Sequence, residues 1–303
     1  MSLPPQIRVL QRGWLSSNNI LFYDEDGCTL VDSGYVAHAA QTLLLLQHAL
    51  EGKPLARLIN THCHSDHMGG NAAVQRAYGC RIGVPVGEAP AIAAWDDATL
   101  MLSYTGQSAE RFGVDDTICA GERLKLGGLD WEALAAPGHD PYALMFYQAE
   151  ERILISGDAL WQNGFGLIFS ELVGQAGAFA ETRSTLEVIS RLDIATVIPG
   201  HGAPFGSVGR SLQSAFQRLD AYEREPEKLA RHALKVMLSF SLMIHGRIEL
   251  AALPRFLAER PIYADINQRF LNLPQAELCE YLVSDLARAG ALKIEQGWLV
   301  AAA

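Results

Sequence analysis

Cysteine is scarce in this chain and follows no pattern. Five cysteines occur in 303 residues, at Cys28, Cys63, Cys80, Cys119 and Cys279. Their odd number, their wide spacing and the lack of any Cys-x-x-Cys pair argue against a disulfide framework. We therefore expect free thiols that pack as ordinary side chains in a reducing compartment.

Long hydrophobic runs are also missing. Apolar stretches such as residues 43–46 are far too short to cross a bilayer. Residues 1–9 do not show the basic and then apolar pattern of a secretion signal. We expect no membrane partner, and the cytoplasm is the predicted location.

Positive charge is in deficit. Lys and Arg total 24 against 34 Asp and Glu, which gives a formal net charge of −10 and no indication of a broad nucleic-acid surface. Half of the chain (49%) is hydrophobic and 19% is charged, as in a folded enzyme rather than a disordered chain. The length fits one large domain, or a domain with a smaller partner.

Hydrophobic patterns in the first two thirds of the chain predict two sets of strands, each followed by helices. Helical spacing is found at residues 36–50, 70–78 and 185–192. The runs typical of strands are residues 7–10, 17–23, 28–32, 55–60, 81–84, 123–126, 131–135, 144–148, 152–156 and 196–199. We predict an α+β fold in which two packed sheets are covered by outer helices, an αββα sandwich.

The pattern changes after about residue 206. Residues 208–244 have helical spacing with a break around Pro226, and residues 249–259 and 274–289 are further helices. Residues 291–300 read as a hairpin that turns at Gln296-Gly297. Helices followed by a hairpin predict a small winged-helix-like α/β domain at residues 221–303, after a main domain at residues 1–220.

The strongest chemical signal is the segment Thr61-His62-Cys63-His64-Ser65-Asp66-His67. Imidazole and carboxylate groups are common ligands of zinc and similar ions. On an extended strand end His62 and His64 point to the same side, and a turn then lets Asp66 and His67 face a second position. A polar surface loop is the alternative interpretation, and four ligand types at this spacing make it the weaker one.

Three later residues extend this cluster. His139, Asp158 and His201 each follow an apolar strand and stand next to a glycine. Strand ends hold side chains rigidly, and glycine lets the backbone approach closely. Each residue alone is typical of an ordinary turn. Together with the first cluster they indicate a metal site.

The motif His-x-His-x-Asp-His, followed by a distant His, an Asp and a final His, resembles the signature of the metallo-β-lactamase superfamily over about residues 6–205. The resemblance implies two divalent metal ions, zinc by default with iron or manganese as alternatives. It further implies that His62, His64 and His139 bind the first ion, that Asp66, His67 and His201 bind the second, and that Asp158 bridges them with a hydroxide between the ions.

Other roles follow from the same resemblance. Asp66 would also act in catalysis, by orienting the hydroxide or passing a proton to the leaving group. Asp32, in an Asp-Ser-Gly segment, would fix the geometry of a ligand, although a plain turn residue is an equal alternative. Asp140-Pro141 departs from the family, where Ser or Thr precedes the proline, and contacts near His139 are expected to differ.

The substrate leaves a weaker signal. Trp161 and Phe165 follow Asp158, and with Tyr104 they are candidates for an apolar substrate pocket, with core packing as the even alternative. The leading hypothesis is hydrolysis of a small ester, thioester or lactone by the metal-bridging hydroxide. A nuclease is the rival, because the winged-helix-like tail resembles that of the β-lactamase-like endoribonuclease branch.

Charge in the tail does not favour nucleic acid. Residues 221–303 carry ten Lys plus Arg and ten Asp plus Glu, whereas phosphate contacts need a basic face. The tail is instead a candidate for forming a homodimer or covering the active site. A metal-binding winged-helix regulator is the third hypothesis, and the complete ligand set speaks against it.

Overall fold

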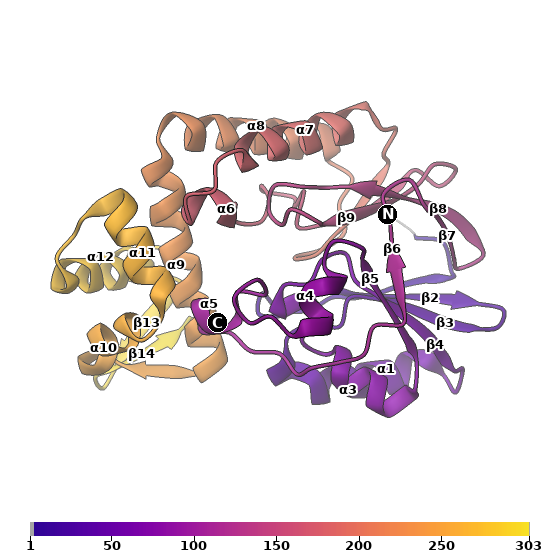
Figure 1. Cartoon of the computed structure of the whole chain (residues 1–303), viewed down its shortest axis with the longest axis horizontal. Helices are drawn as coiled ribbons and strands as arrows, with labels where there is room; N and C mark the ends of the chain where they lie inside the picture. The colour runs from indigo at the N-terminus through magenta and orange to yellow at the C-terminus, as the bar shows by residue number, and fades with distance from the viewer. Residues whose placement is uncertain (1–2, 303) are drawn as a thin grey trace.

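The computed structural model describes residues 3–302, and two facing β-sheets form its centre (Figure 1). The first sheet has the strand order β1-β2-β3-β4-β5-β6. Its first two pairs are antiparallel and the rest are parallel. The strands are β1 (Ile7–Leu10), β2 (Asn19–Asp24), β3 (Gly27–Val31), β4 (Leu55–Ile59), β5 (Arg81–Pro85) and β6 (Asp116–Ile118).

The second sheet has the order β11-β10-β9-β8-β7, and only its β10–β11 pair is parallel. Its strands are β7 (Arg123–Leu126), β8 (Leu129–Ala135), β9 (Leu144–Gln148), β10 (Ile153–Gly157) and β11 (Thr196–Pro199). Apolar side chains from both sheets form one buried cluster between them, in which the Phe22 and Trp131 rings meet edge to face at 5.4 Å.

Helices cover the outer faces of both sheets (Figure 1). The 3₁₀ turn η1 (Val36–His38), α1 (Ala39–Leu50) and α3 (Asn71–Tyr78) lie on the first sheet, and α7 (Ala178–Arg191) and α8 (Val208–Arg224) lie on the second. Helix α3 ends at Gly79, whose left-handed conformation caps it. The predicted αββα sandwich is therefore confirmed.

The chain continues from α8 into a group of helices with a small sheet. Helix α9 (Pro226–His245) starts at the predicted break, where proline fits the first turn of a helix. The remaining elements are β12 (Arg247–Glu249), η2 (Leu250–Ala252), α10 (Leu253–Ala258), α11 (Pro261–Ile266), the π-helix η3 (Asn267–Leu271), α12 (Gln275–Arg288), β13 (Leu292–Glu295) and β14 (Trp298–Ala301). Strands β12, β14 and β13 pair antiparallel in that order. The winged-helix identity of this region stays a prediction.

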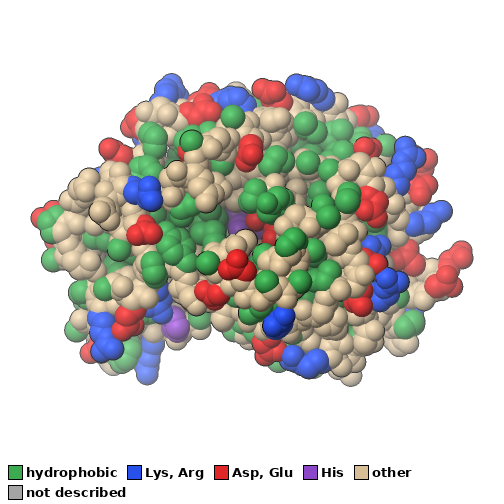
Figure 2. All heavy atoms as spheres, in the orientation of Figure 1, with side chains coloured by type: hydrophobic (Ala, Val, Ile, Leu, Met, Phe, Trp, Pro, Cys, Tyr) green, Lys and Arg blue, Asp and Glu red, His purple; other side chains and the backbone are tan. Residues whose placement is uncertain are grey.

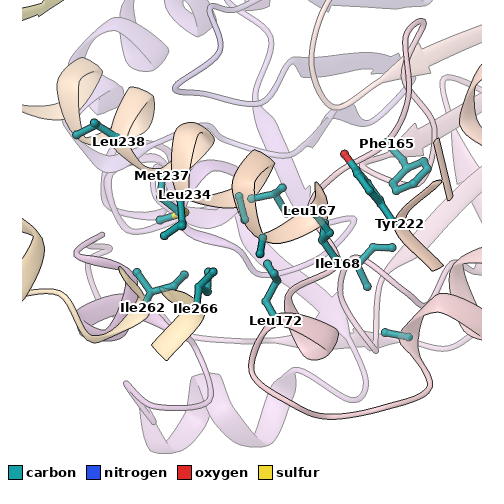
Figure 3. Packing of buried hydrophobic residues seen from close by; sticks show 14 of the residues in the cluster. Phe165, Leu167, Ile168, Leu172, Tyr222, Leu234, Met237, Leu238, Ile262 and Ile266 are labelled. Carbon is teal, nitrogen blue, oxygen red and sulfur yellow. The ribbon is translucent and has the colours of Figure 1, made fainter. Parts of the chain in front are cut away.

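The C-terminal elements share a core with the second layer of helices. One buried apolar cluster extends from Ala136 to Leu299. Figure 3 shows side chains of the segment after β10 lying close to those of α9 and α11. The expected boundary between residues 220 and 221 falls inside α8, and the division into two domains stays a prediction.

The segment between β5 and β6 carries two short helices, α4 (Ala89–Ala94) and α5 (Leu102–Thr105). The hydroxyl of Tyr104 donates a hydrogen bond of 3.0 Å to Asp265 of α11. This bond links the segment to the C-terminal helices. Across residues 3–302, no helix combines the length and the apolar character that a bilayer crossing requires.

Candidate metal centre

Four of the predicted ligands lie in one short stretch after β4. His62 and His64 follow the strand in an extended loop, and Asp66 and His67 lie on the one-turn helix α2 (Ser65–Met68). His64, with extended backbone angles, is the residue that precedes this helix. The change from loop to helix carries the second pair of side chains away from the first.

Two glycines let this helix pack against the loop after β3. A Cβ atom at Gly69 would lie 2.5 Å from the amide nitrogen of Val36, and one at Gly70 would lie 2.5 Å from the carbonyl oxygen of Ser33. Gly69 itself has ordinary helical angles, with φ at −60°. The glycines are therefore required because two backbones approach closely, and not because the turn needs an unusual conformation.

The other three predicted ligands follow strands of the second sheet. His139 comes after β8, Asp158 after β10 and His201 after β11. The backbone beside His201 is close to Asp158, because a Cβ atom at Gly200 would clash with Asp158 Oδ1. The ends of both sheets thus deliver side chains to one place.

All seven residues meet in two groups whose ligand atoms lie within 4.8 Å of one another inside each group. The first group is His62, His64 and His139, and the second is Asp66, His67, Asp158 and His201. In the first, His64 Nδ1 lies 2.9 Å from His139 Nε2. In the second, Asp66 Oδ2 lies 3.0 Å from His201 Nε2.

Asp158 reaches both groups with different oxygen atoms. Its Oδ1 lies 3.3 Å from His67 Nε2, and its Oδ2 lies 3.4 Å from His139 Nε2. Burial would raise the pKa of Asp158, but the neighbouring His67 and His201 hold it well below its ordinary value. An ionised carboxylate in this position is suited to bridging two cations.

Several buried nitrogens fit a metal ion. The Nε2 atoms of His62 and His67 are buried and have no hydrogen-bond partner among the described residues. Burial, together with the nearby His67 and His64, lowers the pKa of His62 well below its ordinary value, so this imidazole is neutral. Unpartnered buried nitrogens cost free energy, and a neutral imidazole is the form that binds a cation.

Asp32 fixes the orientation of His67. Its Oδ2 accepts a hydrogen bond of 2.8 Å from His67 Nδ1, and the carboxylate also accepts bonds from the amide and hydroxyl of Thr61 at 2.9 and 2.8 Å. Burial would lower the pKa of His67, but Asp32 and Asp158 raise it well above its ordinary value, so a cation bound at Nε2 would take the place of a proton there. With Nδ1 donating to Asp32, His67 presents Nε2 to the second group.

Asp140, which stands where the family has Ser or Thr, places a carboxylate beside the first group. Asp140 Oδ2 lies 3.7 Å from His64 Nε2, while His139 Nδ1 donates to the carbonyl of Leu167 at 2.5 Å. Asp140 is also hydrogen-bonded to Glu88. Burial and this neighbouring carboxylate raise the pKa of Glu88 well above its ordinary value. Glu88 follows β5 and belongs to no motif, so no sequence pattern pointed to it.

Two tryptophans flank the second group. The Trp14 ring stacks on His201 at 5.5 Å, and Trp161 meets both rings edge to face. Trp161 also donates from Nε1 to Asp158 Oδ1 at 3.2 Å. Trp14 is 54% exposed and was not predicted, because a single aromatic residue before a strand forms no motif.

A cavity of about 350 Å³ opens above the metal groups. Figure 2 shows a histidine at the bottom of a hollow with hydrophobic side chains along its rim. Trp161 and Phe165 line the cavity, whereas Tyr104 does not, because it bonds to Asp265 instead. The apolar lining residues include Leu100, Met101, Phe165, Leu167, Phe169, Val236, Met237 and Phe240.

Comparison with known sequences identifies proteins that are similar to this chain. The sequence model of the metallo-beta-lactamase superfamily matches residues 12–201, which is more than half of the chain. A hydroxyacylglutathione hydrolase of Methylococcus capsulatus is 25% identical over 282 residues, which cover 87% of this chain and 97% of that protein. A hydroxyacylglutathione hydrolase of Rhodospirillum rubrum is 27% identical over 148 residues. Here the match spans about half of each protein, 49% of this chain and 48% of the relative.

Solved structures share the fold over almost the whole chain. A beta-lactamase domain protein from Burkholderia ambifaria has a TM-score of 0.61 at 21% identity, with 100% of this chain and 94% of that chain covered. A metallo-beta-lactamase family protein from Thermus thermophilus has a TM-score of 0.59 at 19% identity, with coverage of 99% and 100%. At these identities the likeness concerns the fold alone.

Proposed function

Because the chain belongs to the metallo-β-lactamase superfamily, we propose that it is a hydrolase with two divalent metal ions that cleaves a small ester, thioester or lactone. The observation that carries this proposal is the convergence of seven ligand-type side chains in two adjoining groups, with Asp158 in contact with both. Zinc suits the nitrogen-rich first group, and iron and manganese are alternatives.

The metal ions would activate the water and the carbonyl group, and the protein side chains would hold the ions in place. Bound ions lower the pKa of a coordinated water to about 7 and polarise a carbonyl oxygen. His62, His64 and His139 would hold one ion, and Asp66, His67 and His201 the other, with Asp158 between them. Asp32 would keep His67 in the tautomer that leaves Nε2 free.

Asp66 is the residue we propose for proton transfer. Burial would raise its pKa, but the hydrogen bond from His201 and the charge of His67 lower it below its ordinary value. Asp66 lines the cavity, so its carboxylate can accept the proton of the attacking water and pass it to the leaving oxygen or sulfur. Hydrolysis then yields a carboxylic acid and an alcohol or thiol.

The cavity supports a small apolar substrate. Its walls are mainly aliphatic and aromatic side chains, which favour burial of an acyl group over a polynucleotide backbone. Relatives carry the name hydroxyacylglutathione hydrolase, and an acyl group on the sulfur of glutathione is a thioester, which supports thioesters as the first class to test. Helix α9 lines the cavity, so part of the C-terminal region would cover the active site.

The test combines metal content with turnover. We expect elemental analysis of the purified protein to give about two metal ions per chain, and a panel of thioesters, esters and lactones to contain a substrate. Asp158→Ala should abolish turnover while the protein stays folded by circular dichroism. His48→Ala, on the exposed face of α1, serves as the control and should retain activity.

Three results would overturn the proposal. Full turnover by rigorously metal-free protein would exclude metal catalysis. Cleavage of single-stranded RNA that is lost in Asp66→Ala, without cleavage of any acyl compound, would favour the nuclease alternative. Metal binding with neither activity would favour the regulatory alternative.

A further inference from the structure

The cavity above the metal groups has a second polar end. Most of the wall beyond the ligand residues is apolar, but two basic side chains interrupt it, Arg218 from α8 and His232 from α9. Neither residue belongs to the ligand groups, and the proposed chemistry does not use them. A cation next to an apolar binding cavity requires an explanation.

Arg218 has no counter-ion in the protein. Across residues 3–302 its guanidinium makes no hydrogen bond and no ion pair. The acidic residues that follow it on α8 already have partners: Arg183 of α7 pairs with Asp220 and Glu223 at 2.6 and 2.7 Å. On α9, Lys235 pairs with Asp285 at 2.6 Å. Arg218 is therefore a free cation in a half-buried position.

The guanidinium of Arg218 is packed against the loop that leads from Asp158 to α6 (Phe169–Leu172). A Cβ atom at Gly164 would clash with Arg218 Nη1, so the side chain lies directly on the backbone there. Gly166 of the same loop lies against the His139 ring, with a Cβ atom at 2.6 Å from Nδ1. Two residues of chain span at most about 7 Å, which places Arg218 within reach of a substrate bound at the metal groups.

His232 lies near Arg218 and supplies no negative charge that could neutralise the guanidinium. Its ring stacks on Tyr222 at a centroid distance of 6.3 Å. Burial, Arg218 and Lys235 lower the pKa of His232 to about 4, so the imidazole is neutral near pH 7. The groups that face it are thus two cations and a phenol, and none supplies negative charge.

We propose that Arg218 binds a carboxylate at the far end of the substrate's acyl group, so that the substrate has a reactive carbonyl at the metals, an apolar middle and an anionic end. A single guanidinium matches a singly charged carboxylate, which it binds through two parallel hydrogen bonds. The acyl side is favoured over the leaving group because Trp14, at the metal groups, is exposed at the mouth, whereas Arg218 is half-buried between α8 and the loop. This inference rests on the proposed hydrolase function.

The test uses two thioesters of equal acyl length, one ending in a carboxylate and one in the corresponding neutral amide. For the unmodified enzyme we expect kcat/KM to favour the carboxylate by roughly 10- to 100-fold, as for other hydrogen bonds to charged groups. In Arg218→Met this preference should collapse to about twofold or less, and Arg218→Lys should restore part of it. Arg210→Met, at an exposed site on the same helix, should keep the full preference.

A second variant tests the position of the side chain. Gly164→Ala introduces a methyl group where Nη1 now lies, and the φ of 130° at Gly164 also strains an alanine, so the guanidinium and the loop must shift. The variant should reduce the preference while Arg218 remains in the sequence. Equal kcat/KM values for the two thioesters with the unmodified enzyme would overturn the inference. An unchanged preference in Arg218→Met would also overturn it.

The failure of the function and the failure of the inference can be told apart. Calorimetry with the metal-loaded protein measures binding of the product, a dicarboxylate, and of its monoamide. Weaker binding of the dicarboxylate to Arg218→Met without any turnover would contradict the hydrolase proposal and support the anion site. Turnover of both thioesters without a preference would support the hydrolase and contradict the anion site.

Discussion

The pair Asp32 and His67 shows how one carboxylate sets the chemistry of a ligand. Asp32 is buried, has a φ of 58° and accepts hydrogen bonds from the backbone and the hydroxyl of Thr61 as well as from His67. A positive φ is uncommon for aspartate, and the surrounding bonds hold the residue in it. The orientation of His67 therefore depends on the loop after β3.

Replacing Asp32 by Asn tests this dependence. An amide at the same place can present its N–H to His67 Nδ1, which disfavours the tautomer with a free Nε2. We expect metal affinity to fall by roughly 10- to 100-fold, as for other residues that orient a ligand. Competition with a coloured chelator measures the affinity. Asp26→Asn, in an exposed turn, is the control, and an equal affinity in both variants would contradict the role of Asp32.

Residue types and their spacing predicted which seven side chains meet at the candidate site, but not their surroundings. The seven candidate ligands form a motif because histidine and aspartate recur at strand ends beside glycine. Trp14, Glu88 and Arg218 reach the site from a loop, a turn and a helix with no common spacing. Their positions follow from the packing of the two sheets and α8, which local sequence does not specify.

At the scale of elements, the loop between β10 and α6 supports the first metal group. Gly166 lies against the His139 ring, and its amide donates to the carbonyl of Asp158 at 2.8 Å. The loop thus contacts two ligands that come from different strands. Its backbone, rather than its side chains, sets the space available to His139.

Gly166→Ala should disturb this arrangement. The new methyl group would lie 2.6 Å from His139 Nδ1, so the ring or the loop must move. We expect a metal content below that of the unmodified protein and a loss of activity of at least about tenfold, as for other changes that misplace a ligand. Gly209→Ala is the matched control, since no atom lies within 4 Å of its Cβ and alanine favours a helix by up to about 1 kcal/mol. Full metal content in Gly166→Ala would contradict this role of the loop.

His232 makes the pairing of α8 and α9 sensitive to pH. Its folded-state pKa is about 4, below the unfolded value of about 6.5, so the unfolded chain binds more protons between these values. The free energy of unfolding should therefore fall as the pH falls from 6.5 to 4, by about 3 kcal/mol in total from this group.

Urea unfolding of metal-free protein across this pH range measures the effect. His232→Gln should have a shallower pH dependence than the unmodified chain, whereas His48→Gln, exposed on α1, should keep it. Parallel curves for His232→Gln and the unmodified chain would show that His232 does not titrate as described. The other buried histidines contribute equally to all three proteins and cancel in the comparison.

The sequence predicted the long helices more completely than the short ones. The helices α1, α8 and α9 have clear periodic patterns, and Pro226 marks the break between α8 and α9 as predicted. For α7 (Ala178–Arg191) only the part from residue 185 was predicted. Helix α11 and the π-helix after it were missed because six and five residues are too few for periodicity. Tertiary contacts with α9 stabilise them.

At the scale of the whole molecule, the candidate metal centre joins the two layers of the sandwich. Its ligands come from the loop after β4 in the first sheet and from the ends of β8, β10 and β11 in the second. Ions held by both sheets would bind only the folded chain. Metal binding should then stabilise the entire fold by mass action.

Removal of metal tests this coupling. We expect dialysis against a chelator to lower the melting temperature by several degrees, because 1 kcal/mol corresponds to roughly 2–4 °C in a chain of this size or slightly smaller. Zinc added afterwards should restore it in calorimetry. Asp158→Ala should show a smaller difference between the two states. An identical melting temperature with and without bound metal would contradict the coupling.

Helix α9 belongs at once to the cavity wall and to the C-terminal core. Met237 lines the cavity and is also part of the apolar cluster that joins α9 to the helices beyond it. A smaller side chain here would admit bulkier compounds and would also leave a void in that cluster. A substitution that widens the substrate range at this position should therefore also lower the thermal stability of the protein. Compensating stabilising substitutions elsewhere would then be needed to keep the protein folded.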